Sequence, residues 1–159
     1  MKVKDIMYKD VIKVKRSTNM RELFKVVKRF HTFPHIPVVD EEGKLVGVIY
    51  FENLIGVFKP KRPEMLKTIP FLDEEPERDI EDIFASEVTE DVLELVLAED
   101  IMEKRFLSLE EETSVEEAYR LMKMYNREQL PVIDKDHKLV GLLGIFDIIL
   151  TILREKKLI

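Results

Sequence analysis

The most chemically suggestive residues of this chain lie in one short stretch near its end. Gly141, Gly144 and Asp147 stand three residues apart, and the acid lies where an apolar helix is expected to begin. A carboxylate at that point accepts hydrogen bonds from free backbone N–H groups and is stabilised by the helix dipole. Helix chemistry alone therefore accounts for Asp147, so a role in ligand binding needs a second argument.

The sequence lacks the residue patterns of common enzyme active sites. It has no cysteine, no glycine-rich phosphate loop and no serine in a nucleophile elbow. His31 and His35 stand four residues apart, but Pro34 removes the helical geometry of a two-histidine metal pair. His137 falls in a predicted turn, where histidine tolerates a left-handed backbone. The sequence predicts no enzyme, no metal site and no required cofactor.

An internal repeat organises the chain. Residues 130–152, LPVIDKDHKLVGLLGIFDIILTI, follow the same order as residues 36–58, IPVVDEEGKLVGVIYFENLIGVF. Matching residues lie 94 positions apart, as in Pro37 and Pro131, and Asp40 and Asp134. A repeat of this kind fixes the unit of the fold. Each copy predicts a strand, a tight turn, a second strand and an apolar helix.

The two copies also share the segments that precede these strands. The triplet Asp-Ile-Met occurs at 5–7 and again at 100–102, 95 positions apart, and predicts a short helix whose Ile and Met pack inward. Branched and aromatic residues then predict short strands at 11–14 and 106–109. Each repeat therefore has the order β-α-β-β-α once the helix that follows is added.

That helix has its own start signals. Thr113 with Glu116 predicts a capping box in the second repeat, and Asn19 with Glu22 predicts an equivalent cap in the first. Apolar residues follow at helical spacing in both: Met20, Leu23, Phe24, Val26, Val27 and Phe30, and then Val115, Ala118, Tyr119, Leu121, Met122 and Tyr125. Such stripes are typical of buried helix faces.

The turns and the last helices complete the predicted unit. Gly43 and His137 occupy the turn position at which a left-handed backbone is expected. The last helices are expected to begin near Phe51 and Ile145. If the modules were unpaired, these helices would expose an apolar patch that favours a symmetric dimer. The patch consists of Leu54, Ile55, Val57, Phe58, Ile148, Ile149, Ile152 and Leu153.

An insert without a counterpart separates the repeats and divides the chain into residues 1–59, 60–97 and 98–159. Prolines at its start predict an irregular linker. Spaced apolar residues between 80 and 96 predict an amphipathic helix, broken near Thr89, that lies against the repeats or against a second subunit. A strand within its last six residues is the alternative.

Charge is distributed unevenly along the chain. The net charge is −6, but residues 73–100 carry thirteen acids and one base, which leaves +6 on the remainder. We expect the acidic segment to fold back on the basic first repeat.

Overall acidity, and the lack of a basic helix interleaved with aromatics, argue against nucleic-acid binding. Residues 139–153, the longest apolar run, are too short for a membrane span. The N-terminus shows no targeting signal, so a cytoplasmic location is expected.

The duplicated motifs make the chain resemble a tandem pair of cystathionine β-synthase (CBS) domains, a Bateman module. The resemblance is carried by the Asp-Ile-Met triplets, the proline-headed strands at 36–40 and 130–134, and the Leu-Val-Gly triplets at 45–47 and 139–141. It covers the chain except residues 60–97. It implies an α+β fold in which two β-α-β-β-α repeats pack about a pseudo-two-fold axis. The acidic helical insert between them is predicted from its own residues.

The resemblance further implies one cleft per repeat, in which many such modules bind AMP, ADP, ATP or S-adenosylmethionine. The family motif is a glycine, two apolar residues, Thr or Ser, two variable residues, and an Asp that accepts hydrogen bonds from both ribose hydroxyls. The second repeat keeps this acid as Asp147 but has Gly144 in place of the hydroxyl residue that helps to hold phosphate. The first repeat has Asn53 and Tyr50 at these two positions.

The site residues implied by the resemblance form two sets. The second-repeat cleft comprises Asp147, Gly144, Ile145, Phe106, Leu107, Leu130 and Pro131, with adenine between the last four. The first-repeat cleft, in which binding is expected to be weaker, comprises Asn53, Tyr50, Val11, Ile12, Ile36 and Pro37. Asn53 retains an acceptor for one ribose hydroxyl, and Tyr50 is bulky enough to fill its own cleft.

Two functions are compatible with these expectations. The first is a stand-alone regulatory module that binds an adenosine-containing ligand, forms a homodimer and signals to an effector protein encoded elsewhere. The alternative is a structural dimerisation module whose clefts are filled by side chains and bind no nucleotide. Asp147 favours the first function, whereas Tyr50, Gly144 and Asn53 favour the second.

Overall fold

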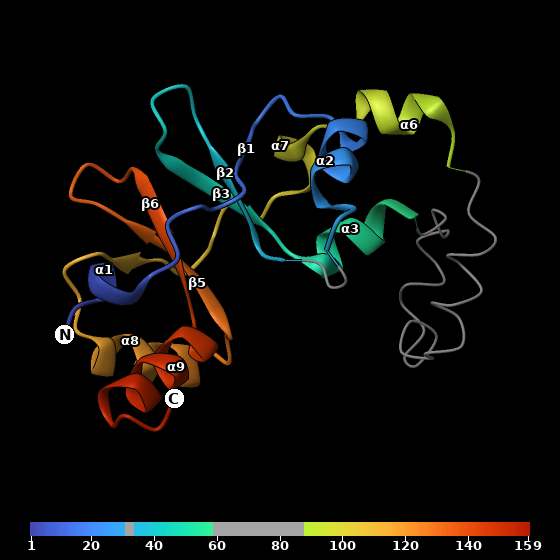
Figure 1. Cartoon of the computed structure of the whole chain (residues 1–159). Coiled ribbons are helices and arrows are strands. Elements are labelled where there is room, and N and C mark those ends of the chain that lie inside the picture. The colour runs from blue at the N-terminus through green and yellow to red at the C-terminus, as the bar shows by residue number, and fades with distance from the viewer. Residues whose placement is uncertain (31–33, 59–87) are drawn as a thin grey trace, which may run out of the picture.

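The structure, a computed structural model, describes residues 1–30, 34–58 and 88–159. The first repeat contains β1 (Val14–Lys15), α2 (Met20–Val27), β2 (Ile36–Val39), β3 (Leu45–Ile49) and α3 (Phe51–Phe58). The second contains β4 (Leu109–Glu110), α8 (Val115–Met124), β5 (Gln129–Ile133), β6 (Leu139–Gly144) and α9 (Ile145–Glu155). Three further helices are α1 (Val3–Ile6), α6 (Glu90–Leu95) and α7 (Ala98–Ile101). The predicted α+β fold with the order β-α-β-β-α in both repeats is confirmed (Figure 1).

Each repeat builds one three-stranded sheet. The strand orders are β1-β2-β3 and β4-β5-β6, with the first pair parallel and the second antiparallel in each sheet. Val38 pairs with Gly47, and the equivalent Val132 pairs with Gly141. A shift of register follows both pairs at the same place. The 94-residue sequence repeat is therefore preserved in the backbone pairing of the strands.

The hairpin turns agree with the sequence prediction. Gly43 has φ +83° and His137 has φ +62°, so both adopt the left-handed conformation that closes the turn. Asp40 Oδ1 accepts the backbone N–H groups of Glu42 and Lys44, each at 2.9 Å. These side-chain acceptors organise the turn before the return strand starts.

The two hairpins meet at the pseudo-two-fold axis. Leu45 N donates to His137 O at 3.0 Å, and the equivalent Leu139 N donates to Gly43 O at 3.1 Å. Lys44 forms a backbone bridge with Lys138, its own counterpart. The reciprocal pattern joins the two sheets across the axis.

Branched residues of the strands and one face of each helix form two cores. Met20 and Leu23 of α2 are fully buried in the first core, as are Ala118 and Met122 of α8 in the second. The buried stripes are narrower than predicted, because four of the predicted members are exposed by 38 to 56%: Val26, Phe30, Tyr119 and Tyr125. The α8 stripe therefore leaves aromatic side chains on the surface.

The short leading helices are exchanged between the repeats. Val3 of α1 is buried in the second core, whereas Ala98 of α7 is buried in the first. The backbones of Tyr8 and Leu142 exchange two hydrogen bonds of 2.8 and 2.9 Å, as do those of Glu103 and Val48 at 2.8 and 3.1 Å. Figure 1 shows α1 against the second lobe and α7 beside α2. Each repeat is completed by a segment that precedes the other one.

Two local predictions were wrong at element starts. Ser114, not Thr113, caps α8 by accepting Glu117 N at 3.2 Å, whereas Asn19 caps α2 as predicted, accepting Glu22 N at 2.9 Å. The first strand of each repeat is also shorter and begins later, at Val14 and Leu109. The preceding residues cross between the two repeats, because the leading segments are exchanged.

The described end of the insert lies on the first repeat. Helix α6 begins after Thr89, which excludes the predicted alternative of a strand at 92–97. Leu93 and Val96 pack against the first core, and Glu94 forms an ion pair of 3.3 Å with Arg21. The remaining predicted insert, residues 60–87, lies outside the described residues. No helix of the described residues is long and apolar enough to span a membrane.

Candidate functional site

The N-terminus of α9 holds Asp147, the acid singled out from the sequence. Its Oδ2 accepts the backbone N–H of Gly144 at 2.8 Å, which caps the first turn of the helix. Oδ1 has no hydrogen-bond partner among the described residues. A carboxylate has acceptor capacity on both oxygens. Asp147 therefore combines a capping role with one free oxygen.

The equivalent residue of the first repeat is fully engaged. Asn53 Oδ1 accepts Tyr50 N at 2.8 Å, which is the same capping bond. Its Nδ2 donates to Glu103 Oε1, also at 2.8 Å. Both ends of the amide are thus satisfied within the protein. An incoming hydroxyl would have to displace one of these bonds.

Aromatic and cationic side chains fill the space around Tyr50. This tyrosine is only 6% exposed, and the ring of His35 meets it edge to face with centroids 5.0 Å apart. The guanidinium Cζ of Arg127, from the second repeat, lies 4.4 Å from the ring centroid of Tyr50. Cation–π contact at this range is attractive. The position that is bare at Gly144 is therefore packed in the first repeat.

His35 and Gln129 are equivalent residues that face their repeats' last helices. His35 Nδ1 and Gln129 Oε1 are buried without a hydrogen-bond partner among the described residues. Burial lowers the pKa of His35, and the nearby Arg127 cation lowers it further, against a hydrogen bond to the Gln129 backbone and the charges of Glu52 and Glu128. Neutral histidine is therefore favoured beside Tyr50.

The other predicted site residues differ in burial and in the elements that carry them. Leu130, Pro131, Ile36 and Pro37 are buried strand residues, and Ile145 and Leu107 pack against the second core. Phe106, Val11 and Ile12 are half-buried and lie before the first strands. A β-carbon on Gly144 would lie 3.3 Å from Asp147 Oδ2 and 3.7 Å from Gln129 Cγ. Gly144, Asp147 and Gln129 are thus brought together.

Sequence reasoning missed the segments that the exchange places beside these helices. Tyr8 lies next to Leu142 on β6, the strand that leads into Asp147. Glu103 lies next to Val48 on β3, the strand that leads into Asn53. The sequence shows that Tyr8 and Glu103 are equivalent, but it contains no signal of which repeat each one joins.

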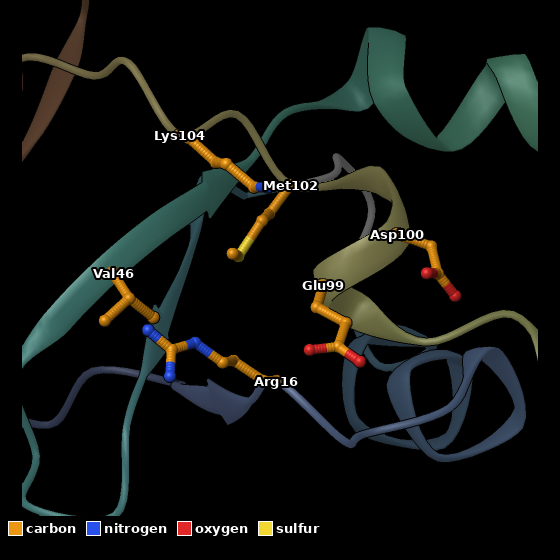
Figure 2. Close-up of a pocket in the computed structure, with 6 residues that line it drawn as sticks. All are labelled: Arg16, Val46, Glu99, Asp100, Met102 and Lys104. Atoms are coloured by element: carbon orange, nitrogen blue, oxygen red, sulfur yellow. The ribbon is translucent and has the colours of Figure 1, made fainter.

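A pocket with charged walls lies apart from both helix starts, where α7 crosses from the end of β1 to β3 (Figure 2). It has a volume of about 580 Å³ and is lined by Arg16, Val46, Glu99, Asp100, Met102 and Lys104. A narrower apolar groove runs between α8 and α9, with Tyr119, Ile149 and Ile152 among its lining residues.

Comparison with known families identifies the repeated unit. The CBS domain model matches residues 3–59 and again residues 98–154. The chain belongs to the CBS domain family. The resemblance noted from the duplicated motifs is confirmed, and the chain contains a tandem pair of CBS domains.

Known proteins similar to this CBS pair include enzymes and separate modules. Inosine-5′-monophosphate dehydrogenase of Methanocaldococcus jannaschii is 28% identical over 148 residues, which make up 93% of this chain but only 23% of that enzyme. The CBS-pair protein CBSX2 of Arabidopsis thaliana, solved in complex with AMP, is 24% identical with a TM-score of 0.67 over 98% of both chains.

A third similar protein is the CBS domain pair of protein MJ0100, solved with 5′-methylthioadenosine and S-adenosyl-L-methionine. It is 23% identical to this chain, with a TM-score of 0.62, and the match covers 96% of this chain and 99% of that one. These structures share the fold of this CBS pair.

Proposed function

We propose that this CBS pair is a regulatory module that binds one adenosine-containing ligand per chain, in the second-repeat cleft beside Asp147. The observation that carries the proposal is the contrast between the two helix starts. Asp147 keeps one oxygen unpaired beside the bare Gly144, whereas Asn53 is bonded at both ends beside the buried Tyr50. A free carboxylate oxygen is an acceptor for the ribose hydroxyls.

Similar proteins support the class of ligand. The CBS-pair structures described above were solved with AMP in one case, and with 5′-methylthioadenosine and S-adenosyl-L-methionine in the other. All three compounds contain adenosine. Because Gly144 offers no hydroxyl for phosphate, the adenosine part of the ligand carries most of the binding. AMP, ADP, ATP and S-adenosylmethionine are the compounds to test.

The proposed regulatory output requires a partner. The module pairs with a second copy through the exposed apolar residues of α8 and α9, and it signals to an effector protein in the cytoplasm. The predicted dimer patch needs correction, because Leu54 and Ile148 are only 6% and 5% exposed within their own cores. Of the predicted patch, Ile149 and Ile152 are 46 and 45% exposed, and Phe146, which the prediction did not include, is 68% exposed.

A structural module without a nucleotide is the second candidate. Tyr50, His35 and Arg127 favour it, because they fill the first-repeat cleft with side chains. A module of this kind would dimerise through the same helices but would leave the second-repeat cleft empty. The two candidates differ in whether adenosine compounds stabilise the chain.

The test is a thermal-shift screen followed by titration calorimetry on two variants. A ligand that binds only the native state raises the melting temperature. Asp147→Asn keeps an acceptor for Gly144 N but loses the charge, and we expect affinity to fall about ten- to a hundred-fold, because charged hydrogen bonds contribute about 1.5–3 kcal/mol. Asn53→Ala is the matched control and should change affinity little.

Three results would reject the proposal. The first is no stabilisation by any of the four compounds, which supports the structural module. The second is loss of binding in Asn53→Ala with Asp147→Asn unaffected, which places the ligand in the other cleft. The third is equal affinity in both variants and the wild type, which places the ligand outside both clefts.

A further inference from the structure

The pocket at the crossing of α7 is separate from the proposed adenosine cleft. Arg16 follows β1, Val46 lies on β3, and Met102 and Lys104 follow α7. Its volume of about 580 Å³ lies in the range of small-molecule sites. The exchanged leading segment forms one wall, so the pocket exists only because α7 docks on the first repeat.

Three charged side chains of this pocket form no close ion pair, although the pKa of Asp40 is lowered by backbone hydrogen bonds and also, at longer range, by the Arg16 cation. The backbone N–H of Glu99 donates to Arg16 O at 3.1 Å, which holds the two residues side by side. Yet Arg16, Glu99 and Lys104 form no ion pair with any described residue. Figure 2 shows the side chains of Arg16 and Glu99 near one another, with Met102 pointing into the space above Arg16.

The second acid of the pocket is engaged through one oxygen. Asp100 Oδ2 accepts the backbone N–H of Leu97 at 2.8 Å, which caps α7. Its carboxylate points away from Arg16 in Figure 2. The pocket therefore offers two cations and two carboxylates, one of which also caps α7, and its formal net charge is zero.

In the second repeat, one of the equivalent charges forms an ion pair. Its counterpart of Glu99 is Lys4, which together with Lys2 forms an ion pair with Glu112. The position of Glu112 is occupied by Ser17 in the first repeat. The charge at the position of Glu99 is thus paired in one repeat and unpaired in the other among the described residues. Fold alone does not require the unpaired arrangement.

An apolar wall completes the pocket. Met102 packs directly on Gly47, where a β-carbon would clash with Sδ. Val46 lines the same side, and both residues are half-buried. A ligand with a short hydrocarbon chain between charged groups would place that chain against this wall and its ends against the charges.

We propose that this pocket binds an acidic α-amino acid, of which L-glutamate is the representative. The planar guanidinium of Arg16 takes the α-carboxylate, because its fork matches two carboxylate oxygens. Glu99 takes the ammonium group, and Lys104 takes the side-chain carboxylate. The two carboxylates of the ligand then lie against Arg16 and Lys104, and its ammonium group lies against Glu99. Met102 and Val46 contact its methylene groups.

Titration calorimetry of the full chain with L-glutamate tests this proposal, and compounds lacking one group test each contact. Glutarate lacks the ammonium group, and 4-aminobutyrate lacks the α-carboxylate. Both should bind about ten-fold or more weakly than L-glutamate, since each loses one charged interaction. Inorganic phosphate is the probe for a simple anion site and should bind more weakly still.

Paired variants locate the binding. Arg16→Gln and Glu99→Gln should each weaken L-glutamate binding about ten-fold or more. Lys15→Gln is the matched control, because the adjacent Lys15 is exposed and already forms an ion pair of 3.4 Å with Glu41. Asp147→Asn should leave L-glutamate binding unchanged, which separates this site from the adenosine cleft.

Four outcomes would overturn the proposal. The first is the absence of L-glutamate binding at about 1 mM. An affinity for glutarate or phosphate equal to the affinity for L-glutamate would indicate a simple anion site. Arg16→Gln and Glu99→Gln variants with circular dichroism and affinity like the wild type would place the ligand elsewhere. Equal losses in Lys15→Gln would indicate a general charge effect.

Discussion

Single residues decide how the two CBS repeats differ. Asn53 and Asp147 form the same capping bond at the same helix position through one terminal oxygen. Their other terminal atom differs, because it is a nitrogen in Asn53 and an oxygen in Asp147. The amide nitrogen of Asn53 finds Glu103, whereas the carboxylate oxygen of Asp147 stays free. The sequence predicted this asymmetry from residue types. It did not predict the packing of His35 and Arg127 on Tyr50, because these contacts join segments far apart in the chain.

His35 should make stability depend on pH. Its pKa is lowered in the folded chain, chiefly by burial, so the neutral form is favoured by folding. Stability from this residue is therefore present above the unfolded pKa of about 6.5 and is lost as pH falls below it. We expect the melting temperature to drop on acidification more in the wild type than in His35→Asn.

Thermal melts between pH 8 and pH 5 measure this effect, with roughly the unfolded histidine pKa at the centre of the range. His137→Asn is the control, because asparagine also tolerates the left-handed turn found at that position. A wild type and a His35→Asn variant with parallel pH profiles would show that His35 does not titrate on unfolding.

At the level of elements, the exchange of α1 and α7 is the feature that the sequence did not reveal. The strands, turns and last helices followed from local patterns, and Ile145 and Phe51 begin their helices as predicted. The leading helices share the same apolar residues, Ile and Met, so burial alone does not decide which core each one joins. Charge does distinguish the two leading helices, because Lys2 and Lys4 at α1 form ion pairs with Glu112.

Reversing these charges should loosen α1. Hydrogen bonds from Lys2 and Lys4 lower the pKa of Glu112 to about 2, so the pair is charged at neutral pH. The variant Lys2→Glu/Lys4→Glu should melt at a lower temperature and show faster amide exchange in α1. Adding Glu112→Lys should recover part of both losses, because the attraction is restored with opposite sign.

The matched control for charge is Lys13→Glu, which reverses an exposed lysine that forms no ion pair with the described residues. It should leave the exchange of α1 unchanged. If Glu112→Lys gave no recovery, the leading helix would be held by Val3 and its apolar neighbours rather than by charge.

At the scale of the whole molecule, the apolar groove between α8 and α9 bears on assembly. Its exposed residues, Tyr119, Ile149 and Ile152, were predicted in part from the apolar helix pattern, although Tyr119 was assigned to the core. The sequence could not separate core from surface here, because α9 is apolar on more than one face. An exposed apolar surface of this kind favours a symmetric dimer.

Light scattering at micromolar concentration tests the dimer. The wild type should have twice the mass of one chain, and Ile149→Lys/Ile152→Lys should have the mass of one, because buried unpaired charges oppose association. Val26→Lys is the control, since Val26 is 38% exposed on α2 outside the groove. A monomeric wild type would refute the dimer, and a dimeric groove variant would place the interface elsewhere.

The number of adenosine ligands bound per chain tests the central claim most directly. Equilibrium dialysis of the full chain against radiolabelled AMP or S-adenosylmethionine, whichever raises the melting temperature more, measures this number. The account predicts one ligand per chain in the wild type and in Asn53→Ala, and a loss of binding in Asp147→Ala. Two ligands per chain, or one that persists in Asp147→Ala and disappears in Asn53→Ala, would contradict it.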